Sequence, residues 1–256
     1  MSAKIYAIVN QKGGVGKTTT AVNLGASLAE SGKRVLIIDV DPQANATSGV
    51  GLKVDEIDKT LFDLLNDAVS VDQTIYPTSV ENLHVIPAGA DLSGAVVTLL
   101  NKENREYLLK DALVPVSELY DFILLDCPPS LGILTINALA AAQKIMVPVQ
   151  CEYYAMEGLS RLMDLVDLMK RDVNPELELG GIILTMFDPR TKLNQEVVKE
   201  TKKHFNDLVF ESIIPRNVRI SEAPSFGQPI SVYAKQSAGA DAYRKLAKEV
   251  IANEFK

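Results

Sequence analysis

Short runs of apolar, mostly β-branched residues recur along the chain, and longer amphipathic segments separate them. Residues 35–38 and 122–125 are continuous apolar runs, which are typical of strands that are covered by helices on both faces. The pattern predicts strands over residues 4–10, 34–41, 83–87, 122–127, 144–150, 180–186 and 209–214.

Between these strands, apolar residues recur at i, i+3 and i+4 spacing, which indicates crossover helices. Alternating strands and helices are typical of an α/β fold with a mostly parallel, twisted sheet and helices on both faces. The chain has no internal repeat, low-complexity tract or Pro/Ser-rich linker, so we expect a single domain over residues 1–256. Residues 50–82 show no regular pattern and receive no assignment. The predicted helices cover residues 18–30, 105–119, 134–143, 156–171, 194–205 and 239–253.

The composition indicates a globular protein of the cytoplasm. Hydrophobic residues make up 47% and charged residues 23% of the chain, which excludes a disordered or fibrous protein. Cys127 and Cys151 cannot form a disulfide framework, and neither belongs to a close-spaced Cys/His ligand set. The N-terminus lacks a signal-peptide layout, and no run approaches the roughly 18 apolar residues of a membrane span. We therefore expect a cytoplasmic protein without a membrane role.

The net charge of −7 at first argues against a nucleic-acid partner, because phosphate binding needs concentrated Lys and Arg. The charges are unevenly distributed, however. Residues 188–256 contain 12 Lys and Arg against 9 Asp and Glu, a net charge of +3, whereas the preceding 187 residues contain 14 against 24. The overall acidity therefore does not exclude DNA, and a modest basic face on one subunit would bind DNA weakly by itself.

The clearest chemical signal is a glycine-rich run, KGGVGKT at residues 12–18, between a predicted strand and a predicted helix. Small residues allow consecutive backbone N–H groups to surround phosphate oxygens at a helix N-terminus. Lys17 would then reach the β- and γ-phosphates, and the Thr18 hydroxyl would coordinate Mg²⁺. Gln11 replaces the first glycine of the usual pattern, and Lys12 is an additional lysine. The alternative, a glycine-rich turn without a ligand, is disfavoured by three glycines and two lysines in this context.

Two predicted strands end in carboxylates. Asp39 and Asp41 have i, i+2 spacing, which puts both on one strand face at the carboxyl edge, where open α/β sheets bind ligands. Asp126 follows four apolar residues, the Walker B form in which a carboxylate holds Mg²⁺. For Asp39 a structural role as the cap of the next turn stays open. Cys127, beside Asp126, is better explained as a small buried residue than as a redox group.

Residues 10–20 resemble the deviant Walker A motif of the ParA/MinD/nitrogenase-iron-protein class of ATPases. Three further segments, residues 43–49, 148–155 and 214–224, resemble the small chromosomal ParA proteins of the Soj type. The resemblance extends from about residue 4 to residue 250. It implies a single deviant-Walker-A P-loop NTPase domain that binds ATP and Mg²⁺.

The resemblance also implies roles for individual residues. Lys12 would reach across a dimer interface to the partner subunit's nucleotide, and Asp41 would position or deprotonate the attacking water. Asp39 would support either Mg²⁺ or the loop geometry. The implied catalytic residues are Lys12, Lys17 and Asp41, the implied metal ligands are Thr18, Asp39 and Asp126, and the implied nucleotide-binding residues are Lys12, Gly13, Gly14, Val15, Gly16, Lys17, Thr18, Thr19, Met186, Pro215 and Asn217.

Arg190 and Arg219 match positions that the family uses to bind DNA without sequence preference, and Lys235 is a further candidate. Arginine suits this task because its planar fork binds phosphate through two hydrogen bonds. Without the resemblance, a solvated cation or an intramolecular ion pair would be the favoured explanation of each arginine. Met186 could likewise be a core residue rather than an adenine contact. Further candidates for DNA contacts are Arg244, Lys245 and Lys248.

The implied function is ATP-dependent DNA partitioning. ATP would close a sandwich homodimer that binds double-stranded DNA on the nucleoid, and a ParB-type centromere-binding protein would stimulate hydrolysis. Whether the DNA is a chromosome or a plasmid stays open. The main alternative is a MinD-like membrane-associated ATPase of the cell-division site, because one face of the last predicted helix carries the apolar residues Tyr243, Leu246, Val250 and Ile251. Docking of that face on the protein's own sheet explains the stripe equally well.

Overall fold

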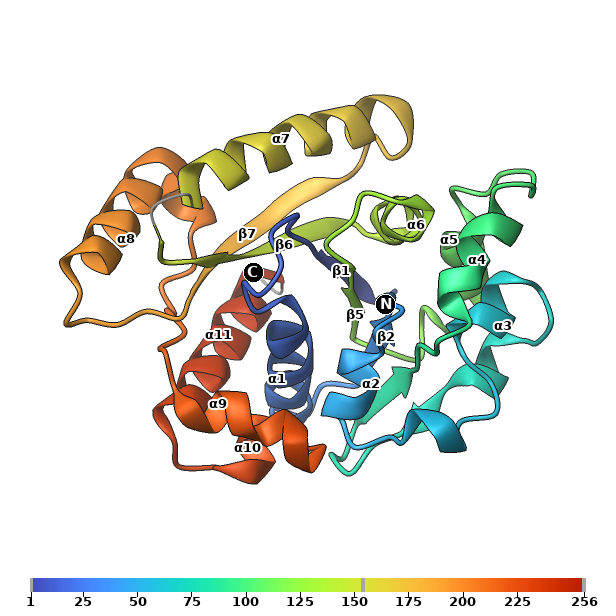
Figure 1. The fold of residues 1–256 in the computed structure, drawn as a ribbon, viewed down its shortest axis with the longest axis horizontal. Coiled ribbons are helices and arrows are strands. Elements are labelled where there is room, and N and C mark those ends of the chain that lie inside the picture. The colour runs from blue at the N-terminus through green and yellow to red at the C-terminus, as the bar shows by residue number, and fades with distance from the viewer. Residues whose placement is uncertain (1, 153–154, 255–256) are drawn as a thin grey trace.

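The computed structural model describes residues 2–152 and 155–254, and the structural statements below refer to these residues. Its strands are β1 (Lys4–Ile8), β2 (Val35–Asp39), β3 (Tyr76–Pro77), β4 (Leu83–Ile86), β5 (Phe122–Asp126), β6 (Lys144–Gln150) and β7 (Glu178–Thr185). They form one seven-stranded sheet in the order β3-β4-β2-β5-β1-β6-β7 (Figure 1). Neighbouring strands pair in parallel except β3, which is antiparallel to β4 at one edge.

Helices cover both faces of the sheet (Figure 1). One face carries α1 (Lys17–Glu30), α2 (Asn45–Gly49), α9 (Val218–Glu222), α10 (Ile230–Tyr233) and α11 (Ala238–Glu254). The other face carries α3 (Leu61–Leu65), α4 (Leu92–Leu99), α5 (Leu108–Leu113), α6 (Ile133–Ala141), α7 (Ala155–Asp172) and α8 (Lys192–Phe205). Across residues 2–152 and 155–254, every helix is too short or too polar to cross a membrane. The predicted α/β fold is confirmed.

Successive side chains of the central strands point to opposite faces of the sheet, and both faces are covered, which explains the uninterrupted apolar runs. In β2, Leu36 and Ile38 pack into the core under α3 to α8, whereas Val35 and Ile37 pack into the core under α1 and α11. All four side chains are fully buried. Each contributes about 1.5–3 kcal/mol of hydrophobic stabilisation, so neither face of the strand can accommodate a polar residue before the carboxyl edge.

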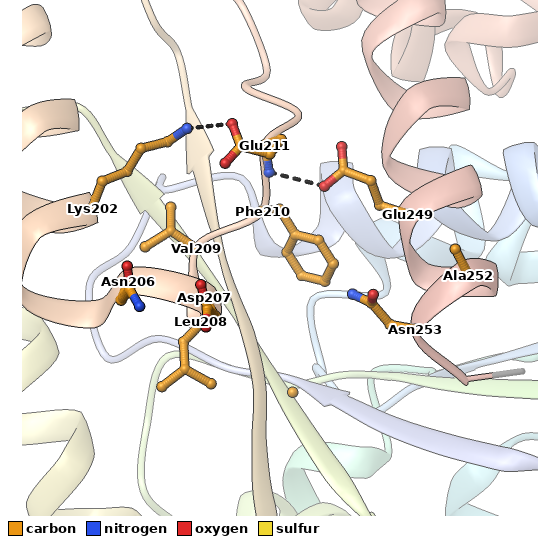
Figure 2. A pocket seen from close by; sticks show the side chains of 11 residues that line it. Lys202, Asn206, Asp207, Leu208, Val209, Phe210, Glu211, Glu249, Ala252 and Asn253 are labelled. Atoms are coloured by element: carbon orange, nitrogen blue, oxygen red, sulfur yellow. Dashed lines mark hydrogen bonds and ion pairs between the residues drawn. The ribbon is translucent and has the colours of Figure 1, made fainter. Parts of the chain in front are cut away.

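The predicted strand over residues 209–214 is wrong in detail. Within this segment only Val209 forms a β-bridge, to Ile182 of β7, and Pro215 just after the segment bridges to Phe187. The N–H groups of Glu211 and Ser212 donate instead to the Glu249 carboxylate of α11, each over 2.9 Å. Figure 2 shows Glu249 directed at the Glu211 backbone. The segment therefore forms no regular strand pairing with β7, because α11 accepts hydrogen bonds from backbone N–H groups at its centre.

A hollow of about 620 Å³ lies beside this segment, between the β7 edge, α8 and α11 (Figure 2). In this hollow Lys202 Nζ contacts Glu211 Oε2 at 2.5 Å, and Glu249 accepts from the neighbouring Glu211 N–H. Gly180, near the amino end of β7, is part of its lining. The hollow therefore lies away from the carboxyl edge, where the acidic residues and the glycine loop meet.

Two further differences from the predicted elements have local causes. The helix expected over residues 105–119 ends as α5 at Leu113 and continues as a 3₁₀ turn, because Pro115 has no N–H to donate. The unassigned residues 50–82 contain α3, which begins with a capping box formed by Thr60 and Asp63. Such one-turn helices are too short to produce a recognisable apolar period.

Candidate nucleotide-binding site

A tight loop joins the end of β1 to the start of α1 at the carboxyl edge of the sheet. Gly14 and Gly16 have φ angles of 74° and 94°, in the left-handed region that glycine adopts at no steric cost. Val15 between them is buried, and its carbonyl oxygen accepts a hydrogen bond of 2.9 Å from Thr185 Oγ1 at the end of β7. The loop is therefore held in a curl that opens onto the N-terminus of a long helix, an arrangement suited to anions.

Lys17 is the first residue of α1, and only 7% of it is exposed. Its Nζ donates to the Lys12 carbonyl oxygen over 3.3 Å. Burial lowers the pKa of Lys17, while the charges of Asp126 and Asp41 act in the opposite direction. A buried ammonium is costly unless an anion neutralises it. A phosphate held by the loop would supply that anion.

Lys12 has a different environment. Its side chain is about half exposed, and Nζ forms an ion pair of 3.0 Å with Glu152 Oε2. The other Glu152 oxygen accepts from Gln150 Nε2 over 2.6 Å, which fixes the carboxylate at the end of β6. The Lys12 N–H donates to Asn10 Oδ1 over 3.0 Å. Lys12 is therefore held at the protein surface, and Glu152 is a partner that the sequence pattern did not reveal.

Asp126 is a fully buried carboxylate at the end of β5. Neither of its oxygens has a hydrogen-bond partner in the described part of the chain, although Thr18 lies near enough to lower its pKa. Its strand register places it directly beside Asp39 of β2. Burial and then the charge of Asp39 raise the pKa of Asp126 well above its usual range. An ionised carboxylate at this position requires a cation.

Asp39 is equally buried but is fully bonded. Its Oδ2 accepts from the N–H and the hydroxyl of Thr47, over 2.8 and 2.7 Å, and Oδ1 accepts from the Asp41 N–H over 3.3 Å. Burial raises the pKa of Asp39 to about 6, and the Thr47 bonds oppose that rise. Thr47 in turn accepts from the Ala88 N–H over 3.0 Å. Asp39 therefore organises the loop that carries Asp41.

Asp41 begins that loop and is half-buried. Its Oδ1 accepts from the Gln43 N–H over 3.0 Å, while Oδ2 makes no hydrogen bond to a described residue. Its charge influences both Lys17 and Asp126, so it lies near the phosphate loop. The three predicted carboxylates thus meet at one edge of the sheet, with one bonded, one partly bonded and one without a partner.

The donor set fits Mg²⁺ with a nucleotide better than a metal bound by protein alone. Among the described residues, no group of three or more His, Cys, Asp or Glu side chains could hold a metal ion. Mg²⁺ typically takes one or two carboxylates and completes its octahedron with phosphate oxygens and water. The partnerless Asp126 and the half-buried Thr18 at the start of α1 match that requirement.

A cavity of about 250 Å³ opens beside the phosphate loop. It brings together Gly16 and Thr19 with the predicted nucleotide-binding residues Met186, Pro215 and Asn217, which lie about 170 to 200 positions further along the sequence. Asn217 Oδ1 caps α9 by accepting from the Arg219 N–H over 2.8 Å, and its amide nitrogen makes no hydrogen bond to a described residue. The cavity is lined by Gly16, Thr19, Thr185, Met186, Ile214, Pro215, Arg216, Asn217, Ile220, Ser221, Pro224 and Tyr243.

Thr185 is the residue of this site that sequence reasoning missed most clearly. It lines the base cavity and also fixes the phosphate loop through the Val15 carbonyl. The only indication in the sequence was that Thr185 lies near the end of a predicted strand, and so at the same sheet edge as Asp39 and Asp126. A threonine in a β-branched run gives no separate indication of such a role.

The basic residues predicted to contact DNA lie on the surface. Arg190 is 87% exposed in its side chain and pairs with Asp188, and Arg219 is 61% exposed and pairs with Glu222. Lys235 is exposed after α10, and its carbonyl oxygen accepts from an Arg244 guanidinium nitrogen.

The chain is similar to known proteins over nearly its whole length. The AAA domain family matches residues 3–179. The sporulation initiation inhibitor protein Soj of Bacillus subtilis (strain 168) is 55% identical over 250 residues, which cover 98% of this chain and 99% of that protein. The chromosome partitioning protein ParA of Myxococcus xanthus (strain DK1622) is 52% identical over 248 residues, which cover 97% and 88%.

Among solved structures, cobyrinic acid a,c-diamide synthase from Mycobacterium smegmatis with a bound ATP analogue and magnesium is similar, with a TM-score of 0.86. The match covers 98% of this chain and 96% of that one at 35% identity. The fold is therefore shared with proteins of other activities, and the much higher identity to partitioning proteins decides the family. The resemblance expected from the sequence is confirmed: the chain belongs to the ParA/Soj family of chromosome partitioning ATPases.

Proposed function

We propose that this chain is an ATP-dependent DNA partitioning protein that hydrolyses ATP with Mg²⁺. The observation that carries the proposal is a buried lysine in a glycine loop beside a buried carboxylate, Asp126, that has no hydrogen-bond partner in the described chain. Each group needs an ionic partner. A Mg²⁺–ATP complex provides both, as a phosphate for Lys17 and a cation for Asp126.

The phosphates would lie against the N–H groups of residues 13–19. Thr18 and Asp126 would hold Mg²⁺, which neutralises charge on the phosphate oxygens when it is bound. The oxygens of Asp39 are committed to Thr47 and Asp41, so we assign Asp39 to the loop rather than to the metal.

The adenine would occupy the cavity beside the loop. Met186 and Pro215 supply apolar contacts there, and the Asn217 amide nitrogen can donate to a ring nitrogen of the base. The cavity is linked to the phosphate loop through Thr185, so base and phosphates would be read by one connected unit.

Asp41 would accept a hydrogen bond from the attacking water through Oδ2 and orient it towards the γ-phosphate. Lys17 would stabilise the charge that develops on the transferred group. Since Asp39 and Thr47 fix the loop, Asp41 needs little rearrangement to reach this position.

Lys12 would serve a second subunit. Its ion pair with Glu152 is about half exposed, and such pairs contribute only about 0–1 kcal/mol. Lys12 can therefore leave Glu152 for the phosphates of a partner's nucleotide, where its charge would act as an arginine finger does. ATP would thus join two copies into a sandwich dimer.

Dimerisation would also create the DNA surface. Arg190, Arg219 and Lys235 are exposed, and two copies of a modest basic face bind a polyanion far better than one. The resulting binding is independent of base sequence, places the protein on the nucleoid, and ends when a ParB-type centromere-binding protein stimulates hydrolysis.

The MinD-like alternative loses its support in the sequence. Tyr243, Leu246 and Val250 of α11 are all at most 1% exposed, because they pack in the core between α11 and the sheet, and the partly buried Ile251 packs against the same core. The stripe is thus unavailable to a lipid surface. Sedimentation with anionic vesicles in ATP tests this directly, since ATP-dependent pelleting would favour the membrane role.

The nucleotide site is tested by Lys17→Ala, with Lys53→Ala as a control at an exposed lysine outside the site. Loss of ATP binding in the first variant alone is expected. Unchanged ATP affinity in Lys17→Ala would remove the basis of the proposed function. Gel filtration of Lys12→Ala with ATP tests the dimer separately, since this variant should bind ATP yet remain monomeric.

A further inference from the structure

The two arginines assigned to DNA lie in segments that the backbone joins. Arg190 is in the turn after β7, and Arg219 is in α9. The Arg216 N–H donates to the Phe187 carbonyl oxygen over 2.9 Å, so the chain leading into α9 runs beside the chain leading to Arg190. Arg216 also lines the base cavity. The basic residues therefore belong to one region next to the nucleotide site.

Both arginines already hold a carboxylate. Arg190 binds Asp188 through two hydrogen bonds, from Nε to Oδ1 at 2.9 Å and from Nη2 to Oδ2 at 2.7 Å. The hydrogen bonds from Arg190 lower the pKa of Asp188 to about 2, so it is ionised at neutral pH. Arg219 Nη1 contacts Glu222 Oε2 at 2.9 Å, and the Tyr233 hydroxyl donates to the same oxygen over 3.1 Å.

A carboxylate and a phosphate use the same donors of a guanidinium fork. While Asp188 occupies both donors of Arg190, a DNA phosphate cannot form the bidentate contact, and the carboxylate also repels it. Arg216 provides a contrast in the same region, since it is exposed and has no carboxylate within 4.0 Å in the described chain.

We propose that Asp188 and Glu222 compete with the DNA phosphates for Arg190 and Arg219, because each carboxylate occupies an arginine that DNA must bind. This inference rests on the proposed DNA-binding function. The arginine side chains are 87% and 61% exposed, which makes each pair weak, so DNA can displace the carboxylates when two subunits act together. A single subunit, in which a carboxylate occupies each of these two arginines, holds DNA poorly.

The test uses Asp188→Asn, Glu222→Gln and the double variant of the full chain. Asn retains an oxygen for the Arg190 N–H, which donates to Asp188 Oδ1 over 3.0 Å, and Gln retains an acceptor for Tyr233. Glu56→Gln is the control, because it removes one charge from another surface ion pair, with Lys53, outside this region. Equal thermal melting temperatures would show that all variants fold.

Binding is measured by fluorescence anisotropy with a labelled duplex, ATP and Mg²⁺ over a salt series. Each variant should bind about two- to fivefold more tightly than wild type, the range for an exposed ion pair, and the gain should be largest at low salt. Affinity no higher than that of the control, or weaker binding, would overturn the inference, because the carboxylates would then be irrelevant or would orient the arginines. Wild-type protein that fails to bind DNA with ATP would instead overturn the proposed function itself.

Discussion

Asp126→Asn should make the nucleotide-free protein more stable while destroying its Mg²⁺ site. The wild-type carboxylate is fully buried beside Asp39, and neither oxygen has a partner in the described chain. Asparagine has nearly the same shape and no charge. The substitution therefore removes the repulsion and the ionisation cost, although the buried amide still lacks partners.

The magnitude can be scaled from the neighbouring carboxylate. Asp39 has a pKa raised to about 6 even with hydrogen bonds from Thr47, which corresponds to about 3 kcal/mol between its two protonation states. Asp126 is just as buried and has only the nearby Thr18 hydroxyl and the charge of Lys17 to oppose the rise in its pKa, so we take a similar cost for it. Subtracting roughly 1–2 kcal/mol for the buried amide leaves a gain of about 1–2 kcal/mol. For a domain of this size, each kcal/mol raises Tm by about 2–4 °C.

Denaturant titration without nucleotide or metal measures this gain as an increase in the free energy of unfolding. Because burial raises the pKa of Asp126, its cost appears as the pH rises above the unfolded value of about 3.9. The advantage of Asp126→Asn should thus be small near pH 4 and larger at pH 8. Addition of Mg²⁺ and ATP should then raise the Tm of wild type much more than that of the variant. A variant that is less stable than wild type at pH 8, or that keeps the full Mg²⁺–ATP response, would refute the reasoning.

Three other substitutions probe separate parts of the account. Asp41→Ala should retain ATP affinity but lower the hydrolysis rate by roughly 10²-fold or more, leaving a dimer that stays on DNA, and rapid turnover in a phosphate-release assay would contradict its role. Thr185→Val should lower the free energy of unfolding by about 1–3 kcal/mol and weaken ATP binding, because it leaves a buried loop carbonyl oxygen without a donor, whereas Thr185→Ser should behave as wild type. Glu254→Gln should lower Tm at pH 7 but have little effect near pH 2. Burial disfavours the charged form of Glu254, yet the hydrogen bonds from Lys144 and Tyr6 outweigh burial and lower its pKa. The contribution of Glu254 to stability is therefore lost as the pH falls through this lowered pKa. Equal Tm differences at both pH values would argue against that last assignment.

The strands that carry the site could be predicted because they obey simple patterns. Residues 35–38 and 122–125 are buried on both faces, so their apolar runs end only where Asp39 and Asp126 reach the sheet edge. The glycine loop could be predicted because its conformation requires glycine at Gly14 and Gly16. Such elements can be predicted because burial of a strand, or the backbone conformation of a loop, restricts the residues at those positions directly.

The different states of the two buried carboxylates could not be predicted. Asp39 and Asp126 occupy equivalent strand ends, and only the fold shows that Thr47 reaches Asp39 and leaves Asp126 without a partner. The ion pair between Lys12 and Glu152 likewise joins residues 140 positions apart. These contacts depend on which strands become neighbours, and a single sequence does not specify that order.

The edge beyond β7 shows a second limit. Residues 209–214 have the composition of a strand, but Glu249 of α11 takes the N–H groups that a ladder would use. Nothing in the sequence indicates that this carboxylate on a helix face accepts from the backbone N–H groups of a distant segment. Tertiary contacts therefore override β propensity here.

A nucleotide and salt titration of DNA affinity tests whether ATP makes this protein bind DNA. Wild-type protein is added to a labelled duplex of arbitrary sequence with ATP, with ADP or without nucleotide, each in the presence of Mg²⁺. We expect tight binding with ATP only, equal affinity for unrelated sequences, and a steep loss of affinity as salt rises. DNA affinity that is the same in all three nucleotide conditions, or that does not change with salt, would contradict this expectation.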